Sequence, residues 1–333
     1  MGELPPLTWQ TALTTWSVSP VFDALALLAL VCYVDLLRRR SAAGQRWPAR
    51  ATACFMTGIG MLLISVNSSI EVYGHALLWV HMIQHLLLIM IVPVLLIWGQ
   101  PIRLIRTALA REPSPEHGWG GPLLRTVTFP VLTVGLYAAV LVVTHLTGFP
   151  EAMTTRMWVH DLEVAVYLIS GYLLFLPLVG AEDSPRQVPH VIRFALLAMA
   201  MGADTLVGVA LMLTGQPLAP STLLTRPGWG PTLLHDQSAA GAIMWVGGDL
   251  LMMVLMLLVA AQWSASGQQA RLGNWLEAAR RQSLTRIAAN SGTDTDRTTV
   301  GASSDVDDDE EALQAYNRML AELHRRHPGP PGG

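Results

Sequence analysis

The fold is decided by residues 76–99, ALLWVHMIQHLLLIMIVPVLLIWG, a run that contains no acidic residue, lysine or arginine. A helix of about 20 apolar residues can cross the ~30 Å hydrocarbon core of a bilayer. His81 and His85 lie four residues apart in this run, so a helix places both on one face, about 6 Å apart along its axis. Ionisable groups inside a membrane are energetically costly and usually functional, so these two histidines are the first candidates for a site.

The whole chain has the composition of a membrane protein. It has 333 residues, of which 52% are hydrophobic and 14% charged, and its mean hydropathy is +0.41. These values exclude an ordinary soluble domain. Several stretches have the length of a membrane span and lack the period-two alternation of strands, so helices are predicted. The predicted spans are residues 20–37, 51–69, 76–98, 127–147, 157–180, 191–213 and 239–262.

The first span is predicted to be a retained helix rather than a signal peptide. The preceding residues 1–19 lack a basic region, and the apolar run has no obvious cleavage site. We therefore expect three regions: an outer N-terminal segment (1–19), a seven-helix transmembrane domain (20–262) and a cytoplasmic tail (263–333). Within the tail, residues 268–286 are predicted to be amphipathic, 287–309 a disordered linker and 310–326 a short helix.

Arginine placement predicts the orientation of the bundle. Arginines follow the first, third, fifth and seventh spans, whereas the opposite connections hold only Arg156 and Arg226. Because positively charged loops stay in the cytoplasm, the N-terminus is predicted outside and the C-terminus inside, which requires an odd number of spans. The sequence therefore predicts an all-α, polytopic bundle of about seven transmembrane helices in the plasma membrane.

This orientation brings six of the ten histidines to the outer half of the membrane or to outer loops. His117 and His190 would lie in inner loops, and His324 and His327 in the tail. Imidazole is the commonest metal ligand in proteins, and histidines that converge from separate spans favour a metal or haem site over isolated packing residues. The predicted ligands are His81, His85, His145, His160 and His235 (the last in the loop before the seventh span), with His75 as a supporting residue.

Carboxylates gather near the same histidines. Asp161 and Glu163 follow His160, and Asp236 follows His235, while Asp204 and Asp249 lie within the sixth and seventh spans. A carboxylate beside a liganding histidine commonly orients its ring, so Asp161, Asp236, Asp204 and Asp249 are predicted to support the site. Two structural alternatives stay open: Asp236 could cap the seventh helix, and Asp204 could bond a neighbouring helix.

Sulfur ligands are a minor possibility. Met82, Met153 and Met157 lie near the outer face, and thioethers suit Cu(I), but most of the 15 methionines occur where adaptable packing is the usual explanation. Cys32 and Cys54 have no CxxC spacing, so neither a disulfide framework nor a thiolate metal site is predicted.

Several motifs resemble those of the CtaG family of bacterial cytochrome c oxidase assembly proteins. They are Trp47-Pro48-Ala49-Arg50, Tyr73-Gly74-His75, HMIQHLLLIMIVPVLLIWGQP (81–101), His145, Val159-His160-Asp161, GYLLF and PLVG (171–180), and DQSAAG with Ile243-Met244-Trp245 (236–245). The similarity covers roughly residues 16–262, and the tail helix around Tyr316-Asn317 resembles actinobacterial members. The resemblance implies a multi-span protein that helps to build the oxidase and to deliver copper to it.

Three functions remain open at this point. The first is an assembly factor that holds copper transiently and passes it to oxidase subunits, with other copper chaperones as further partners. The second is a copper transporter, which would need ligands at successive depths through the bundle. The third is a haem-binding redox protein with axial histidines. No nucleophile–base pair, P-loop or GxGxxG context is present, so an enzyme is not expected, and no nucleic-acid partner is indicated.

Overall fold

The computed structural model describes residues 4–108, 128–179, 188–226 and 228–265. Within these residues every regular element is helical and no strand occurs. The chain divides into two units, Met1–Ala260 and Ala261–Gly333, and the described helices pack together in the first. The predicted tail segments 268–286, 287–309 and 310–326 lie outside the described residues.

The elements follow one another as helices and short helical turns. Short π-helical turns follow α5 at Leu87–Ile91 and α13 at Ile243–Gly247. A short 3-10 helix, Pro220–Leu224, lies between α12 and α13. The helices are α1 (Trp9–Thr14), α2 (Pro20–Ala42), α3 (Ala49–Asn67), α4 (Ser69–Gly74), α5 (Leu78–Leu86), α6 (Val92–Trp98), α7 (Pro101–Ala108), α9 (Pro130–Leu146), α10 (Phe149–Thr155), α11 (Met157–Val179), α12 (His190–Leu213) and α13 (Leu233–Ala242).

Six membrane-spanning helices are present in the described residues, or seven with the α9–α10 pair. The six are Pro20–Ala42, Ala49–Asn67, Leu78–Ala108, Met157–Val179, His190–Leu213 and Leu233–Ala265. Helix α9 has 17 residues, about 26 Å of helix, and α10 follows at an angle of 71°. Counting the bent pair as one broken span gives the predicted seven, and the all-α polytopic fold is confirmed.

The third and seventh spans differ most from the predicted boundaries. The third continues through α7 to Ala108, after Gln100 adopts a positive φ of 52°. The seventh begins at Leu233, where the Thr232 side chain accepts a hydrogen bond from the His235 backbone and caps α13. The prediction that His235 lies in a loop is therefore wrong, because the capped helix starts two residues before it.

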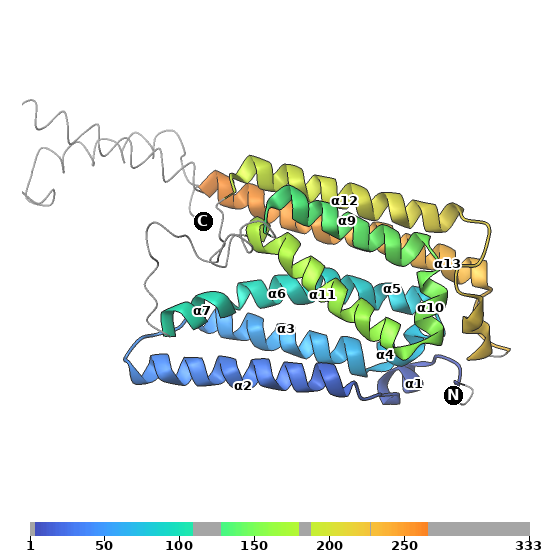
Figure 1. Cartoon of the computed structure of the whole chain (residues 1–333), viewed down its shortest axis with the longest axis horizontal. Coiled ribbons are helices and arrows are strands. Elements are labelled where there is room, and N and C mark those ends of the chain that lie inside the picture. The colour runs from blue at the N-terminus through green and yellow to red at the C-terminus, as the bar shows by residue number, and fades with distance from the viewer. Residues whose placement is uncertain (1–3, 109–127, 180–187, 227, 266–333) are drawn as a thin grey trace, which may run out of the picture. The chain divides into compact units, whose positions relative to one another are not determined.

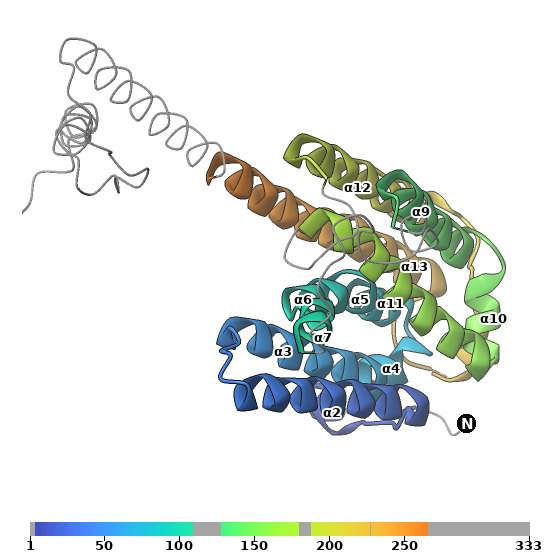
Figure 2. The same cartoon turned by 60° about the vertical axis from the view of Figure 1, so that its left-hand side comes forward.

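The third span is the centre of the bundle. In its most apolar stretch of 18 residues, 72% of the residues are buried. The corresponding share is 17% for the Pro20–Ala42 span at the edge. Helices α5 and α6 contact α3, α11 and α13, and α12 in turn packs on α9 and α13 (Figure 1). In Figure 2 the α2–α3 pair and the α9–α12 pair lie on opposite sides of this span. A histidine on α5 is consequently shielded on several sides by protein.

A local irregularity brings α11 close to this central span. Pro93 has no N–H to donate to the Ile89 carbonyl, and the preceding turn is a π-helix. Gly171 of α11 lies against this carbonyl, where an added Cβ would overlap the Ile89 oxygen. The expected interruption at Pro93 is thus matched by a glycine that lets the two backbones approach, and the approach holds α11 beside α5.

One end of the bundle, here called the α4 end, is formed by α1, α4 and α10, and α7 lies at the opposite end (Figure 1). The N-terminal segment covers part of the α4 end. Tyr73 donates a hydrogen bond to the Pro5 carbonyl at 3.1 Å, and Trp229 Nε1 donates to the Leu4 carbonyl at 2.9 Å.

Asp236 fixes the start of α5 at this end. Its carboxylate accepts hydrogen bonds from the backbone N–H groups of Leu78 (3.1 Å) and Trp79 (3.0 Å), and from the fully buried Arg226 side chain (3.1 Å). The first N–H groups of a helix otherwise lack partners. Asp236 therefore does not cap its own helix, as one alternative proposed, and it supports the histidine helix by capping α5 instead.

Candidate metal centre

Four of the predicted histidines converge at the α4 end of the bundle. His81 and His85 come from α5, His145 from the last turn of α9, and His160 from the first turns of α11. All four are buried. Their ring centroids are 4.0 Å apart for His81 and His85, 5.8 Å for His81 and His160, and 5.1 Å for His85 and His145. The expected convergence is therefore observed, while ligation by these residues stays a prediction.

A buried carboxylate, Glu163, lies at the centre of these histidines. One oxygen, Oε2, is 3.3 Å from His81 Nε2 and 3.7 Å from His160 Nδ1, and the other, Oε1, is 3.3 Å from His85 Nε2. Glu163 has a side-chain exposure of 3%. The described groups within ion-pair distance of it are all histidines. A carboxylate buried this deeply needs a compensating positive charge.

His145 fixes the ring of His85. The Leu141 carbonyl can only accept, and it lies 2.9 Å from His145 Nδ1, so that nitrogen holds the proton. His145 Nε2 is then an acceptor, and it lies 3.2 Å from His85 Nδ1. A neutral His85 therefore keeps its proton on Nδ1 and directs the lone pair of Nε2 at Glu163. The tautomer is assigned from the hydrogen bonds: the Leu141 carbonyl can only accept, which sets the proton of His145 and through it that of His85.

Glu71 fixes His160 in the same way. Its carboxylate accepts from His160 Nε2 at 3.0 Å, from His75 Nε2 at 3.3 Å and from Gln84 Nε2 at 2.5 Å. Burial alone would raise the pKa of Glu71, but the hydrogen bonds from His160 and His75 outweigh it and lower that pKa from 4.5 to about 2. Glu71 is consequently ionised and acceptor-only at neutral pH. Glu71 thus accepts the Nε2 proton of His160, and the other ring nitrogen of His160, Nδ1, faces Glu163.

The cluster contains buried polar atoms without hydrogen-bond partners in the described part of the chain. They include His81 Nδ1, His85 Nε2, His160 Nδ1 and Glu163 Oε2. Buried polar groups are normally satisfied, so an orphaned set calls for an unseen partner such as a water or an ion. Three of these four atoms lie at the contact between the imidazole lone pairs and the carboxylate. This arrangement fits a cation, which attracts every one of these groups.

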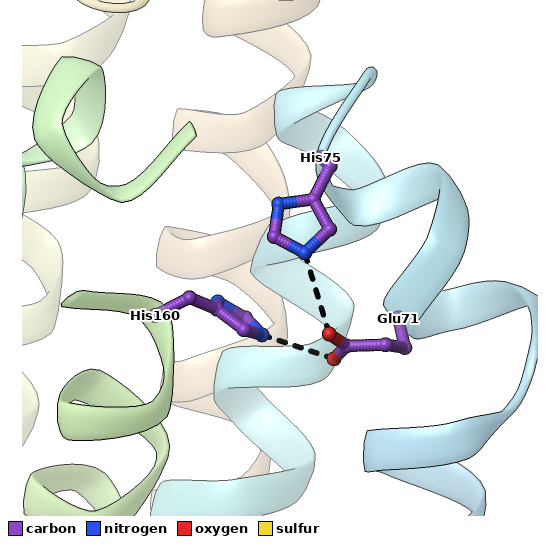
Figure 3. A group of neighbouring side chains, drawn as sticks. All are labelled: Glu71, His75 and His160. Carbon is purple, nitrogen blue, oxygen red and sulfur yellow. Dashed lines mark hydrogen bonds and ion pairs between the residues drawn. The ribbon is translucent and has the colours of Figure 1, made fainter. Parts of the chain in front are cut away.

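The ligand atoms have the spacing of metal donors. Those of His81, His160 and Glu163 all lie within 4.8 Å of one another, and so do those of Glu71, His75 and His160 (Figure 3). Imidazole nitrogen with carboxylate oxygen suits Cu, Zn, Fe or Ni, whereas Cu(I) selects sulfur. The two cysteines are free and lie on α2 and α3.

Other predicted residues lie apart from the cluster. His235 is exposed on α13, and Asp161 is exposed on α11, one residue after His160 and turned away from the face that holds Glu163. His75, predicted as supporting, does approach the cluster: its ring centroid is 4.6 Å from that of His160. The structure therefore gives no position beside the cluster to His235 or Asp161.

Asp204 and Asp249 form a separate polar group between helices. Tyr137 of α9 donates a hydrogen bond to the Asp204 carboxylate of α12 at 2.9 Å, and Thr205 donates to Asp249 at 2.9 Å. The alternative in which Asp204 bonds a neighbouring helix is therefore the one observed. Both carboxylates therefore accept hydrogen bonds from hydroxyl groups, and neither bond involves a histidine of the cluster.

Glu163 was noted beside His160 in the sequence but not predicted to belong to the site, and Glu71 was not noted, although the spacing of each to a histidine indicated it. Glu163 follows His160 by three residues and Glu71 precedes His75 by four, spacings that place each pair on one helix face. Asp161, adjacent to His160, could not share its face. In a helix, the carboxylate that contacts a histidine is therefore expected three or four residues away rather than next to it in the sequence.

Comparison with known proteins gives a family. A family model described as cytochrome c oxidase caa3 assembly factor (Caa3_CtaG) matches residues 29–266, which include the whole cluster. A relative from Mycobacterium leprae is 27% identical over 322 residues, covering 94% of this chain and 45% of the relative. Relatives from Mycobacterium bovis and Mycobacterium tuberculosis are each 28% identical over 338 residues, covering 97% of this chain and 47% of the relative.

These relatives are described only as uncharacterised proteins. The chain spans about half the length of the curated relatives it matches. No solved structure matches the chain. The family match agrees with the resemblance found in the sequence motifs, and it describes assembly of the oxidase rather than catalysis.

Proposed function

The chain belongs to the Caa3_CtaG family of cytochrome c oxidase assembly factors, and we propose that it holds one copper ion in transit and supplies it to the oxidase. The proposed ligands are His81, His160 and Glu163, with His85 completing the set from the other carboxylate oxygen. The single observation that supports this most is the group of imidazole nitrogens from His81, His85 and His160 that surrounds one buried carboxylate.

The hydrogen bonds around the cluster support a cation rather than a self-contained network. His145 and Glu71 each use the only proton of a neighbouring neutral imidazole, and the remaining nitrogen faces Glu163. A lone pair and a carboxylate repel each other unless a proton or a metal cation lies between them, and we propose that copper takes this position. Partners that fix the tautomer of a ligand in this way are typical of metal sites.

The proposal changes the roles expected of two residues. His145 was expected to be a ligand, and here it is a positioning residue that orients His85, because its Nε2 is occupied by the His85 bond. His235 takes no part. Glu163 becomes the residue that supplies negative charge, and a copper ion bound beside it would neutralise a charge that the bundle otherwise leaves buried among imidazoles.

Copper transport is less well supported by the same observations. In the described residues, both groups with the spacing of metal donors include His160 and lie at the α4 end. Further into the bundle the buried polar groups include the Tyr137–Asp204 and Thr205–Asp249 pairs, which offer oxygen atoms only. A site at one end suits holding and delivery to partners, which we propose are oxidase subunits and other copper chaperones.

Haem binding is also less well supported. Two axial histidines must leave space between them for the whole macrocycle. The imidazoles of His81 and His85 are in direct contact, and His85 also packs against Tyr167 at 4.2 Å between ring centroids. The cluster is therefore too compact for a porphyrin.

Metal analysis of the purified full-length protein tests the proposal. The protein should retain one copper ion after dialysis, and the variant His81→Ala, His85→Ala should lose it while its helical circular dichroism is unchanged. The control His235→Ala removes an exposed histidine and should keep the ion. Retention of copper by the double variant, or a Soret band in the wild-type protein, would contradict the proposal.

A further inference from the structure

His160 belongs to two groups of metal donors at once. The inner set is His81, His160 and Glu163, and the entry set is Glu71, His75 and His160. Figure 3 shows the entry set: Glu71 lies between the two imidazoles, with one carboxylate oxygen toward His75 and the other toward His160. The two sets come from α4, α5 and α11, and only His160 is common to both.

The two ring nitrogens of His160 face different sets. Nε2 is 3.0 Å from the Glu71 carboxylate, and Nδ1 is 3.7 Å from the Glu163 carboxylate. A neutral imidazole has one lone pair, so it can ligate one ion at a time. The geometry therefore allows either set to be filled, but His160 cannot serve two ions together.

Burial differs between the sets. The His75 side chain is 13% exposed, against 3% for His81 and for Glu163. His75 is thus the most accessible of the five residues, and an ion that arrives from solvent meets the entry set first. The N-terminal segment lies over the same end through the bond between Tyr73 and the Pro5 carbonyl.

We propose that the cluster offers two alternative positions for one copper ion, and that His160 transfers the ion from the entry set to the inner set. This inference rests on the proposed function. With the ion on Nε2, the ring proton is on Nδ1 and faces Glu163. With the ion on Nδ1, the proton is on Nε2 and faces Glu71. The bonds from the ion to His75, Glu71 and His160 Nε2 break, bonds to His81, Glu163 and His160 Nδ1 form, and one proton moves from Nδ1 to Nε2 of His160 as the ion moves inward.

A purely structural role for the entry set makes a different prediction. If Glu71 only anchors α4 to α11, His75 contributes one hydrogen bond at 3.3 Å and its loss affects neither binding rate nor affinity. If the entry set receives the ion, His75 controls the rate of loading but not the final affinity, because it is absent from the inner set.

Rapid mixing of the purified full-length protein with Cu(II)–glycine separates these cases. His75→Ala should load copper more slowly than the wild-type protein, because an arriving ion then meets only two of the three entry-set ligands. Its equilibrium affinity, measured by competition with a chromophoric chelator, should be unchanged. The control His235→Ala should load like the wild-type protein, and His75→Gln provides a second variant in case the alanine variant is unstable.

A second measurement examines the entry set directly. The His81→Ala, His85→Ala variant, which should lose its ion on dialysis, should still bind added excess Cu(II) weakly at the entry set. That copper should show nitrogen hyperfine structure in the electron paramagnetic resonance spectrum, and adding His75→Ala should abolish the signal. An unchanged loading rate for both His75 variants would overturn the entry set and leave the proposed function intact. If the wild-type protein bound no copper at all, the proposed function itself would fail.

Discussion

Each imidazole of the cluster has two nitrogens, and its neighbours decide which one is free for a cation. His85 depends on His145, because the Leu141 carbonyl holds the His145 proton on Nδ1 and leaves Nε2 to accept from His85. His160 depends on Glu71, whose ionised carboxylate can only accept. The direction of the lone pairs toward Glu163 is thus set by residues that need not touch the ion.

A substitution of His145 distinguishes a positioning residue from a ligand. His145→Ala should lower copper affinity about 10–100-fold, as expected for a partner that orients a ligand, while the protein still binds one ion. Chelator competition measures the affinity, and the absorption spectrum of the bound Cu(II) should keep its nitrogen donors. Complete loss of the ion would instead show that His145 is a ligand.

The histidines of this cluster could be predicted at the residue scale, but their partners only in part. His81 and His85 follow from i,i+4 spacing in an apolar run, and the depth of His145 and His160 follows from the span boundaries. Glu163 could have been found from its i+3 spacing to His160. Contact between Glu71 and His160 could not, because it depends on how the six-residue helix α4 packs against a helix 89 residues away.

At the scale of single elements, the cluster depends on how closely α11 approaches the third span. Gly171 lies on the Ile89 carbonyl that Pro93 leaves without its helical donor, and an added Cβ would meet both residues. The proline was visible in the sequence as an interruption of the helix. The glycine opposite it was not, because its function arises only where two helices cross.

Substitution of this glycine should therefore disturb the distant site. Gly171→Ala should push α11 away from α5, cost about 1–3 kcal/mol of stability as an overpacked contact, and weaken copper binding by separating Glu163 from His81 and His85. Thermal unfolding and chelator competition measure the two effects. Gly135→Ala on α9 is the matched control, since an added Cβ there meets nothing within 4 Å. Equal behaviour of the two variants would refute this dependence.

At the scale of the whole molecule, the cluster and the arginine-rich connections lie at different ends of the described bundle. Helix α7, with Arg103 and Arg106, lies opposite the end formed by α1, α4 and α10 (Figure 1). The positive-inside rule therefore predicts that the α7 end faces the cytoplasm and that the cluster lies toward the outside. The number of spans was predictable because six of them are long and apolar. The sequence did not predict that the remaining one is a short helix, α9, bent against α10.

Reporter fusions test this orientation. Green fluorescent protein fused after Gly333 should fluoresce, because it folds in the cytoplasm, and alkaline phosphatase at the same position should be inactive. A phosphatase fusion in the connection between α9 and α11, which contains α10, should be active. The reverse pattern would place the cluster on the cytoplasmic side and contradict delivery of copper from outside.

Copper content of the oxidase is the most direct measure of whether this cluster serves assembly. In cells that make His81→Ala, His85→Ala in place of the wild-type protein, the variant should remain at normal abundance, because the spans keep their length and apolar composition and Glu163 keeps His160 as an ion-pair partner. The purified oxidase should then contain its haem but too little copper, and copper added to the medium should partly restore it. Cells with His235→Ala should yield normal oxidase. An oxidase of normal copper content and activity from the double-variant cells would contradict the proposal that these histidines hold the copper it receives.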